Sequence, residues 1–305
     1  MEKIDLELLE KIAGLHAVPE GSYNIRKNGQ RLASSSDKDI EIVPKTEGAG
    51  IDVFVRAGVK NKSAHIPVLL TETGIHDAVA NDFHIGEGAD VTIIAGCGIH
   101  CPSAGASEHD GTHRFHLGKN SRVRYVERHY AGGDKNSERV FNPVTECVLE
   151  EGSVLEMETT QLGGVTSTRR ETVAEVGDGA KLYVKEKLLT AGDETAVSVF
   201  TVRLKGKDST CDIVSRSVAR DNSRQEFVSD VIGENECFGH VECDAILLDG
   251  ARVVSTPKID AAHPDASLVH EAAVGKIAGE QLVKLMSLGL DEKQAEDAVI
   301  KGFLN

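Results

Sequence analysis

Thiol and imidazole side chains gather between residues 97 and 116, where the sequence reads CGIHCPSAGASEHDGTHRFH. The groups in this stretch are Cys97, His100, Cys101, His109, His113 and His116, and His129 follows nearby. Zinc and iron–sulfur centres prefer thiolate and imidazole ligands. If Cys97 and Cys101 lie at the end of a strand, both can approach one ion, and we therefore predict a metal site at Cys97, His100 and Cys101. Because Cys-x3-Cys matches no standard zinc or ferredoxin spacing, a polar loop with surface histidines is the alternative.

A second set of candidate ligands lies late in the chain. It contains the thiols of Cys211, Cys237 and Cys243, followed by His270 and Glu271. Thiolate, imidazole and carboxylate together can ligate iron with mixed sulfur, nitrogen and oxygen donors. The alternative for Cys211 and Cys243 is burial as small apolar side chains, and for His270 and Glu271 it is capping or ion pairing at a helix start.

Several common catalytic motifs are absent from the sequence. It contains no Gly-x4-Gly-Lys-Ser/Thr loop, no dinucleotide fingerprint between a strand and a helix, and no Gly-x-Ser-x-Gly elbow. We therefore expect a protein that is not itself an enzyme and has no ATPase of its own.

The elements that must position these residues are predicted to be short strands. From about residue 51 to 260 the sequence shows period-two alternation in segments bounded by polar turns. Five turns end just before residues 89, 121, 153, 180 and 209, so the repeats are 32, 32, 27 and 29 residues long. Such periods are typical of stacked architectures.

A right-handed parallel β-helix fits these repeats best, because each coil buries its apolar face only against its neighbours. No helical segment separates the strands, which argues against a βαβ fold. A β-sandwich is the alternative, although it would show shorter and more regular hairpin turns.

The two ends of the chain differ from this core. Residues 1–16 are predicted to form an amphipathic helix, and residues 17–50 a polar, irregular segment with one or two edge strands. Residues 267–304 are predicted to form two helices separated at Gly289, with Asp291 and Gln294 as a capping pair. The expected organisation is therefore an N-terminal segment 1–50, a β-helix 51–262 and a helical segment 263–305.

Composition excludes several classes of function. The 305 residues carry a formal net charge of −15, and aromatic residues make up 4% with no Trp. A nucleic-acid backbone needs a basic surface, and single strands or sugars need aromatic platforms, so neither partner is expected. No run of 18 apolar residues and no signal peptide occurs, so we expect a cytoplasmic protein with reduced cysteines.

The C-terminal stretch resembles the signature of the SufB/SufD family, the scaffold proteins of the Suf iron–sulfur cluster assembly system. The residues that match in fixed register are His270-Glu271-Ala272, Gly275-Lys276-Ile277, Gln281-Leu282, Leu285, Gly289, Ala295, Ile300 and Gly302-Phe303. Segments 146–164, 176–188 and 242–250 also look like family segments, in the family's order. The resemblance covers about residues 85–304 and implies a β-helix flanked by helices.

The resemblance also implies roles for particular residues. Ala95-Gly96-Cys97 is similar to the family segment whose cysteine receives sulfur, so Cys97 is the expected sulfur acceptor. An acceptor attacks as a thiolate, and we expect partial exposure and a depressed pKa, assisted by His100. His270 and Glu271 match the residues that complete the family's scaffold site, which the thiols of Cys211 and Cys243 would supply with sulfur ligands.

One departure from the family pattern leaves two functions open. The family's late cluster-site cysteine falls close to Ala251, where this chain has no thiol. The first function is a scaffold or transfer component that holds a transient iron–sulfur cluster, with no cofactor permanently bound. The second is a SufD-like structural partner that holds no cluster. In both, the resemblance implies an external ABC-type SufC ATPase docked on residues 276–303, and a homodimer or SufB/SufD-type heterodimer. Without the family, a zinc-type hydrolytic site at Cys97 to His116 is a third reading.

Overall fold

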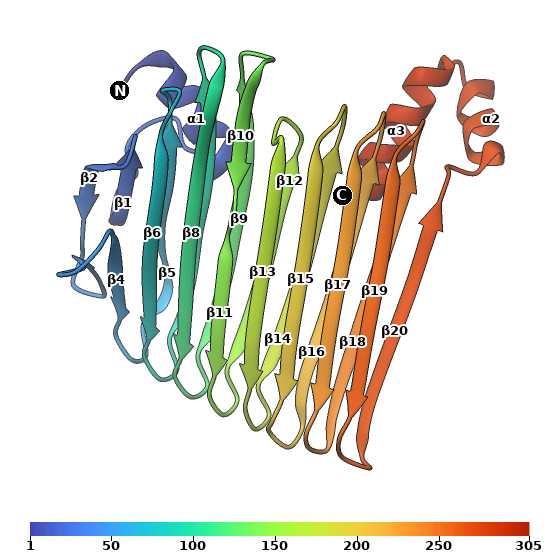
Figure 1. Ribbon diagram of the computed structural model, residues 1–305. Coiled ribbons are helices and arrows are strands. Elements are labelled where there is room, and N and C mark those ends of the chain that lie inside the picture. The colour runs from blue at the N-terminus through green and yellow to red at the C-terminus, as the bar shows by residue number, and fades with distance from the viewer. Residues whose placement is uncertain (305) are drawn as a thin grey trace.

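The chain folds into two facing sheets with helices at both ends, as the computed structural model of residues 1–304 shows (Figure 1). The helices are α1 (Lys3–Ala13), α2 (Gly279–Ser287) and α3 (Glu292–Leu304). The strands are β1 (Ser22–Lys27), β2 (Gln30–Ser35), β3 (Ile40–Pro44), β4 (Gly50–Val55), β5 (Lys60–Leu70), β6 (His76–Ile85), β7 (Asp90–Cys101), β8 (Gly105–Leu117), β9 (Arg122–Gly133), β10 (Ser137–Phe141), β11 (Val144–Leu149), β12 (Val154–Leu162), β13 (Ser167–Val176), β14 (Lys181–Thr190), β15 (Thr195–Leu204), β16 (Ser209–Ala219), β17 (Arg224–Gly233), β18 (Cys237–Leu247), β19 (Arg252–Ala261) and β20 (Ala266–Gly275).

The strands alternate between the two sheets as the chain advances, which makes a solenoid of about 8 turns. The first sheet has the order β2-β1-β5-β7-β9-β12-β14-β16-β18-β20, and the second β19-β17-β15-β13-β10-β8-β6-β4-β3, with β11 pairing β8 and β13. Among the described residues only β1–β2 and β3–β4 pair antiparallel. Neighbours within each sheet come from successive coils and are parallel, so the predicted parallel β-helix is confirmed and the β-sandwich alternative is wrong.

The polar turns that revealed the repeat have a common backbone conformation. The second turn residue has a positive φ in every one: Gly88 64°, Asn120 55°, Gly152 67°, Gly179 59° and Asp208 56°. Glycine, asparagine and aspartate tolerate this left-handed region better than other residues. The turn residues therefore set where each coil reverses, and the strands between them stay in register.

Helix α1 packs on the outer face of the first sheet, over β5, β7 and β9. Its approach to β7 is close at Gly96, where a Cβ atom would lie 2.6 Å from the backbone oxygen of Ile12. Gly14 ends the helix in the left-handed conformation, at φ 66°. The glycines on either side of Cys97 are therefore explained by helix packing outside the sheet.

The ends of the chain correct two expectations. Residues 17–50 contain three strands rather than a mainly irregular segment, and β1 lies between β2 and β5 within the first sheet. His270 and Glu271 lie in β20, the last strand of the solenoid, and not at the start of the helices. The helix signals themselves were correct, because Gly289 has φ 99° and Asp291 and Gln294 exchange backbone-to-side-chain hydrogen bonds of 3.0 and 2.8 Å. None of the helices within residues 1–304 has the length and apolar character needed to cross a membrane.

Candidate functional site

Cys97 points into the lumen of the solenoid, between the two sheets. Alternate residues of β7 face inward, and Cys97 is only 5% exposed. The imidazoles of His109 on β8 and His129 on β9 lie against its thiol. The expected partial exposure of Cys97 is therefore wrong, and the expected help from His100 comes instead from two histidines on neighbouring strands.

The three residues predicted as a metal site do not converge. Cys97 and Cys101 face the lumen, whereas His100 lies on the opposite, outer face of the strand. The Cys101 side chain packs in an apolar cluster with Ile99, Phe141 and other residues at that end of the lumen. We therefore assign no metal to Cys97, His100 and Cys101, because a strand's period of two separates the imidazole from the thiols.

His109 is held by a buried ion pair that sequence analysis missed. Its Nδ1 lies 3.3 Å from Oδ2 of Asp77, and both side chains are only 3% exposed. Arg26 donates from Nη2 to Oδ1 of Asp77 at 2.7 Å. Charged residues at inward positions of these strands interrupt the apolar alternation, and this interruption was the available sequence signal.

These charges tune the acidity of the thiol. Burial alone raises the pKa of Cys97, but His109 and then His129 outweigh it and bring the pKa to about 7. Burial likewise lowers the pKa of His109, yet the Cys97 thiolate and Asp77 raise it to about 10. The geometry therefore favours a buried thiolate–imidazolium pair near neutral pH, as a sulfur nucleophile requires.

Beyond Cys97, charged groups continue along the lumen. Nε2 of His129 lies 3.4 Å from Oε1 of Glu127, and Glu127 accepts a hydrogen bond from Nη1 of Arg170. Nε of Arg170 lies 3.8 Å from Oε1 of Glu186. Glu186 in turn accepts hydrogen bonds of 2.7 Å from the hydroxyls of Ser198 and Ser215. A buried charge is tolerated when an opposite charge lies beside it, and here the His129–Glu127 contact is an ion pair without a hydrogen bond at Nε2.

We call this row of polar and charged side chains, which point into the lumen from successive coils, the polar lane. Its members, in spatial order, are Arg26, Asp77, His109, Cys97, His129, Glu127, Arg170, Glu186, Ser198 and Ser215. The first eight alternate in sign when Cys97 is a thiolate and both histidines are charged. Apolar clusters flank the lane toward the two ends of the strands. The lane is therefore a polar layer between two apolar layers, running along the solenoid axis.

The lane ends beside Cys243, which is the neighbour of Ser215 in the β16–β18 register. Five strand spacings separate β7 from β18, which is roughly 24 Å at about 4.8 Å per spacing. Burial raises the pKa of Cys243 to about 11, although the Ser255 hydroxyl beside it acts in the opposite direction. Cys97 and Cys243 therefore lie at two positions of one polar file, with contrasting acidity.

His270 lies on the inner face of β20, one coil beyond Cys243. The register pairs His270 with Val241 and Cys243 with Ala272, so the thiol and imidazole occupy diagonal positions on adjacent strands. Within residues 1–304, the two ring nitrogens of His270 and the hydroxyl oxygen of Ser255 are buried and have no hydrogen-bond partner. Unpaired buried donors and acceptors mark a place where a ligand or water can bind.

Two other predicted ligands lie elsewhere. Glu271 follows His270 on the strand and therefore projects from the outer face, where it is exposed. Cys211 is fully buried in the main apolar core, and burial raises its pKa to about 12. The structure thus places Cys243 and His270 at diagonal positions beyond the end of the polar lane, but neither Glu271 nor Cys211 lies with them.

Comparison with known proteins decides the family. The model of the SUF system FeS cluster assembly SufBD core domain matches residues 74–303. The chain belongs to the SufBD family. The matched region contains every residue of the polar lane except Arg26.

Relatives match this SufBD chain over different lengths. An iron–sulfur cluster assembly SufBD family protein of Methanocaldococcus jannaschii is 26% identical, over 98% of this chain and 97% of its own length. One of Archaeoglobus fulgidus is 27% identical over 90% of this chain and 70% of its own. One of Pyrococcus horikoshii is 38% identical over a shorter stretch, 34% of this chain and 24% of its own. Family membership supports a role in iron–sulfur cluster assembly.

Two further groups lie on the outside of this SufBD solenoid. His76, Glu108 and Asp110 offer ligand atoms within 4.8 Å of one another. His76 and Asp110 already form a 2.7 Å contact, and the Asn142 amide donates to both carboxylates at 2.8 and 2.9 Å. Because these contacts account for the arrangement, we assign no metal to it.

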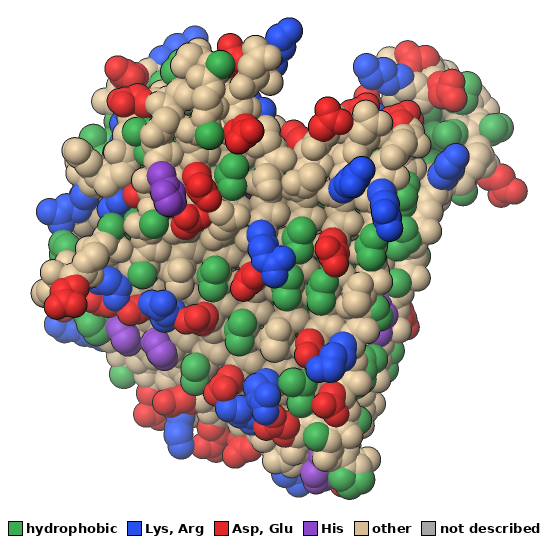
Figure 2. All heavy atoms as spheres, viewed as in Figure 1, with side chains coloured by type: hydrophobic (Ala, Val, Ile, Leu, Met, Phe, Trp, Pro, Cys, Tyr) green, Lys and Arg blue, Asp and Glu red, His purple; other side chains and the backbone are tan. Residues whose placement is uncertain are grey.

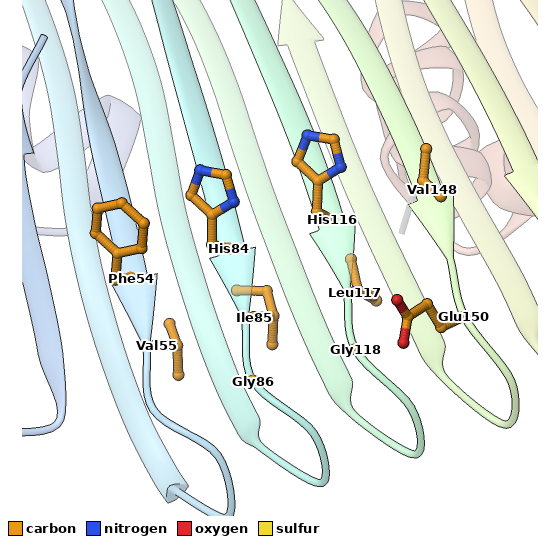
Figure 3. A pocket seen from close by; sticks show the side chains of 10 residues that line it. All are labelled: Phe54, Val55, His84, Ile85, Gly86, His116, Leu117, Gly118, Val148 and Glu150. Carbon is orange, nitrogen blue, oxygen red and sulfur yellow. The ribbon is translucent and has the colours of Figure 1, made fainter.

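The second outer group is a shallow pocket of about 360 Å³ on the second sheet (Figure 3). His84 and His116 stack in it with ring centroids 5.4 Å apart, and Phe54 stacks on His84 at 4.8 Å. The pocket faces solvent, and no thiol lines it. All six cysteines of this SufBD family member are instead buried.

Proposed function

We propose that this SufBD family member is a scaffold or transfer component of iron–sulfur cluster assembly. Cys97 receives sulfur, and Cys243 with His270 holds nascent cluster, the cargo of the reaction, at the open end of the solenoid. The observation that carries this proposal is the polar lane, which joins the acidic thiol of Cys97 to the Cys243 end through the interior. Polar and cationic groups in a low-dielectric interior stabilise anionic sulfur better than an apolar core would.

Anaerobic reconstitution with iron and a sulfur donor tests this function. We expect wild-type protein to gain a visible iron–sulfur chromophore, and Cys97→Ala and Cys243→Ala each to lose most of it. Cys147→Ala is the matched control, because Cys147 is similarly buried but its register neighbours are Phe115 and Ala174 and not members of the polar lane. Equal chromophore in wild type and Cys97→Ala would show that the sulfur-acceptor role is wrong.

The proposal includes an ATPase of the SufC type that docks on the C-terminal helices. Helix α2 buries none of its residues; Val283 within it is 66% exposed, and Leu288, the residue that follows its end, is 76% exposed. Figure 2 shows hydrophobic side chains among the exposed atoms of this projecting segment. An amphipathic helix with an uncovered apolar face is suited to a protein partner.

Binding of the purified ATPase tests this surface. Val283→Glu and Leu288→Glu should each weaken binding at least tenfold in calorimetry, because they place a charge in the apolar contact. Leu162→Glu is the matched control, since Leu162 is 50% exposed on β12, away from the helices. Full binding by both helix variants would exclude this docking site.

A second candidate function is that of a SufD-like structural partner that binds the ATPase without holding a cluster. The absence of a thiol at Ala251, in the turn before β19, favours it. A stoichiometric cluster reconstituted on this chain alone would exclude the purely structural role. Reconstitution only after addition of another SufB-like chain would support it.

A further inference from the structure

An arginine of the N-terminal hairpin reaches the thiol site. Arg26 lies on β1, and its register neighbour Val68 is in turn the neighbour of Cys97. Its Nη2 donates to the Gly29 carbonyl in the hairpin turn at 2.8 Å and to Asp77 at 2.7 Å. The guanidinium is therefore fixed between the turn and the carboxylate, although it lies outside the matched residues 74–303.

Asp77 orients the His109 ring. Because Asp77 faces Nδ1, the ring is left with Nε2 to serve the thiol of Cys97. Gly111 provides the room, since a Cβ atom there would lie 3.0 Å from Nε2. Arg26, Asp77, His109 and Cys97 thus form a relay of contacts from four strands, in the order that orients an imidazole toward a nucleophilic thiol.

We propose that Arg26 and Asp77 are positioning residues that hold His109 against Cys97 and so keep this thiol ionised for attack on a persulfide. The inference rests on the proposed role of Cys97 as the sulfur acceptor, and adds the residues that orient its histidine partner. The N-terminal hairpin is accordingly a part of the sulfur site.

The transfer step is balanced without an added oxidant or reductant. The Cys97 thiolate attacks the outer sulfur of a donor R–S–SH, a new S–S bond forms at Cys97, and the donor's S–S bond breaks. The departing thiolate R–S⁻ takes the proton held on His109 and leaves as R–SH. The transferred sulfur keeps its oxidation level throughout.

Other titratable or charged groups also face this pair and contribute to its titration. They are Glu127 and His129 on β9, Tyr125 on the same strand, Arg170 on β13 and His113 on β8 itself. Removing Asp77 or Arg26 leaves all of these in place. A changed titration in such variants therefore reports the contribution of the relay.

The thiolate absorbance at 240 nm tests the positioning role directly. The difference between the full chain and its Cys97→Ser variant is titrated from pH 5 to 10, alone and in the Asp77→Asn and Arg26→Met backgrounds. We expect the midpoint to rise by at least one pH unit in both backgrounds, and Arg26→Lys and Asp77→Glu to restore part of the shift. Asp5→Asn is the matched control. Asp5 is a buried carboxylate that pairs with Lys27, the residue after Arg26, and it does not face His109.

Mass spectrometry then follows sulfur uptake from cysteine persulfide as a +32 Da addition to the Cys97 peptide. A one-unit rise from a pKa near 7 lowers the thiolate fraction at pH 7 about fivefold, and uptake should slow by that factor. Folded variants whose midpoints stay within 0.3 units of wild type would overturn the positioning role. A shifted midpoint combined with no uptake by wild type would support positioning and instead contradict Cys97 as sulfur acceptor.

Discussion

At the scale of single residues, substitutions in the polar lane can distinguish an effect on protein stability from an effect on sulfur delivery to Cys243. Ser198 and Ser215 each donate one hydrogen bond to Glu186, but only Ser215 adjoins Cys243. Ser198→Ala and Ser215→Val should each cost about 1–2 kcal/mol of unfolding free energy, because each leaves the buried carboxylate short of a donor.

Cluster yield should separate these two variants. Ser215→Val adds apolar bulk where the lane meets Cys243, so reconstitution with persulfide should fall severalfold while sulfur uptake at Cys97 is unchanged. Ser198→Ala should keep its yield. Chemical unfolding and chromophore absorbance measure the two effects, and equal yields would argue that the lane has no part in delivery.

His113 gives a pH-dependent prediction. Its Nδ1 lies 2.6 Å from the Tyr125 hydroxyl, and burial lowers the pKa of His113 from 6.5 to about 4. Between these values the unfolded chain binds more protons, so this contribution to stability is complete above pH 6.5 and is lost as pH falls toward 4. The loss amounts to about 3 kcal/mol.

Urea unfolding at pH 7 and pH 4.5 measures this dependence. His113→Gln should lower stability at pH 7 but flatten the change between the two pH values. His116→Gln on the outer face of the same strand should leave the wild-type dependence intact. If the stability of His113→Gln falls between pH 7 and pH 4.5 as much as that of wild type, groups other than His113 cause the acid sensitivity.

At the scale of elements, the contact between α1 and β7 depends on a missing side chain. A Cβ atom at Gly96 would lie 2.6 Å from the Ile12 oxygen, whereas at Gly98 it would meet the movable Leu8 side chain at 3.1 Å. Gly96→Ala should therefore destabilise the protein by about 2 kcal/mol and Gly98→Ala by less. Hydrogen exchange of α1 should increase in Gly96→Ala. Removal of residues 1–14 should reduce the difference between the two variants, leaving only the 3.0 Å contact of the added Cβ atom with the Arg128 backbone oxygen.

The strands and turns of the solenoid were the features that the sequence predicted best. Period-two alternation and repeated left-handed turns predicted the coils, because both features follow from local backbone geometry. The partners in the lumen could not be predicted in the same way. Arg170 on β13 meets Glu127 on β9 across the lumen, because the two strands belong to different sheets, and a single sequence does not state how the two sheets face each other. His270 was predicted to lie at the start of the helices but belongs to β20. Only a few residues separate β20 from α2, so the sequence analysis assigned the strand residues to the predicted helical segment.

At the scale of the whole molecule, the solenoid ends on an uncovered coil. Strands β19 and β20 are the last in their sheets, and their outer edges have no partner among the described residues. Pro257 interrupts the edge of β19, whereas β20 contains no proline. Because an unpaired edge invites another strand, we expect two copies to join through β20.

Sedimentation velocity tests this dimer. Val269→Lys places a charge on β20 and should shift a dimer to monomer, while Val173→Lys on the central strand β13 should not, although both side chains are about 40% exposed. A wild-type chain that stays monomeric at tens of micromolar would instead favour a heterodimer. The dimer would also cover the unpaired polar atoms of His270 and Ser255.

The alternation of charge inside the lumen has a consequence for how this protein can vary. A neutral substitution at Glu127 or Arg170 alone leaves the other residue as an unpaired charge in the buried lumen. Replacing both with apolar residues removes one positive and one negative charge, so the net charge of the lumen is unchanged. In evolution, the charged residues of the polar lane should therefore change in pairs, with both partners of an ion pair substituted together. Laboratory libraries that randomise one such position should recover almost only the parental residue, and libraries that randomise neighbours jointly should recover new pairs.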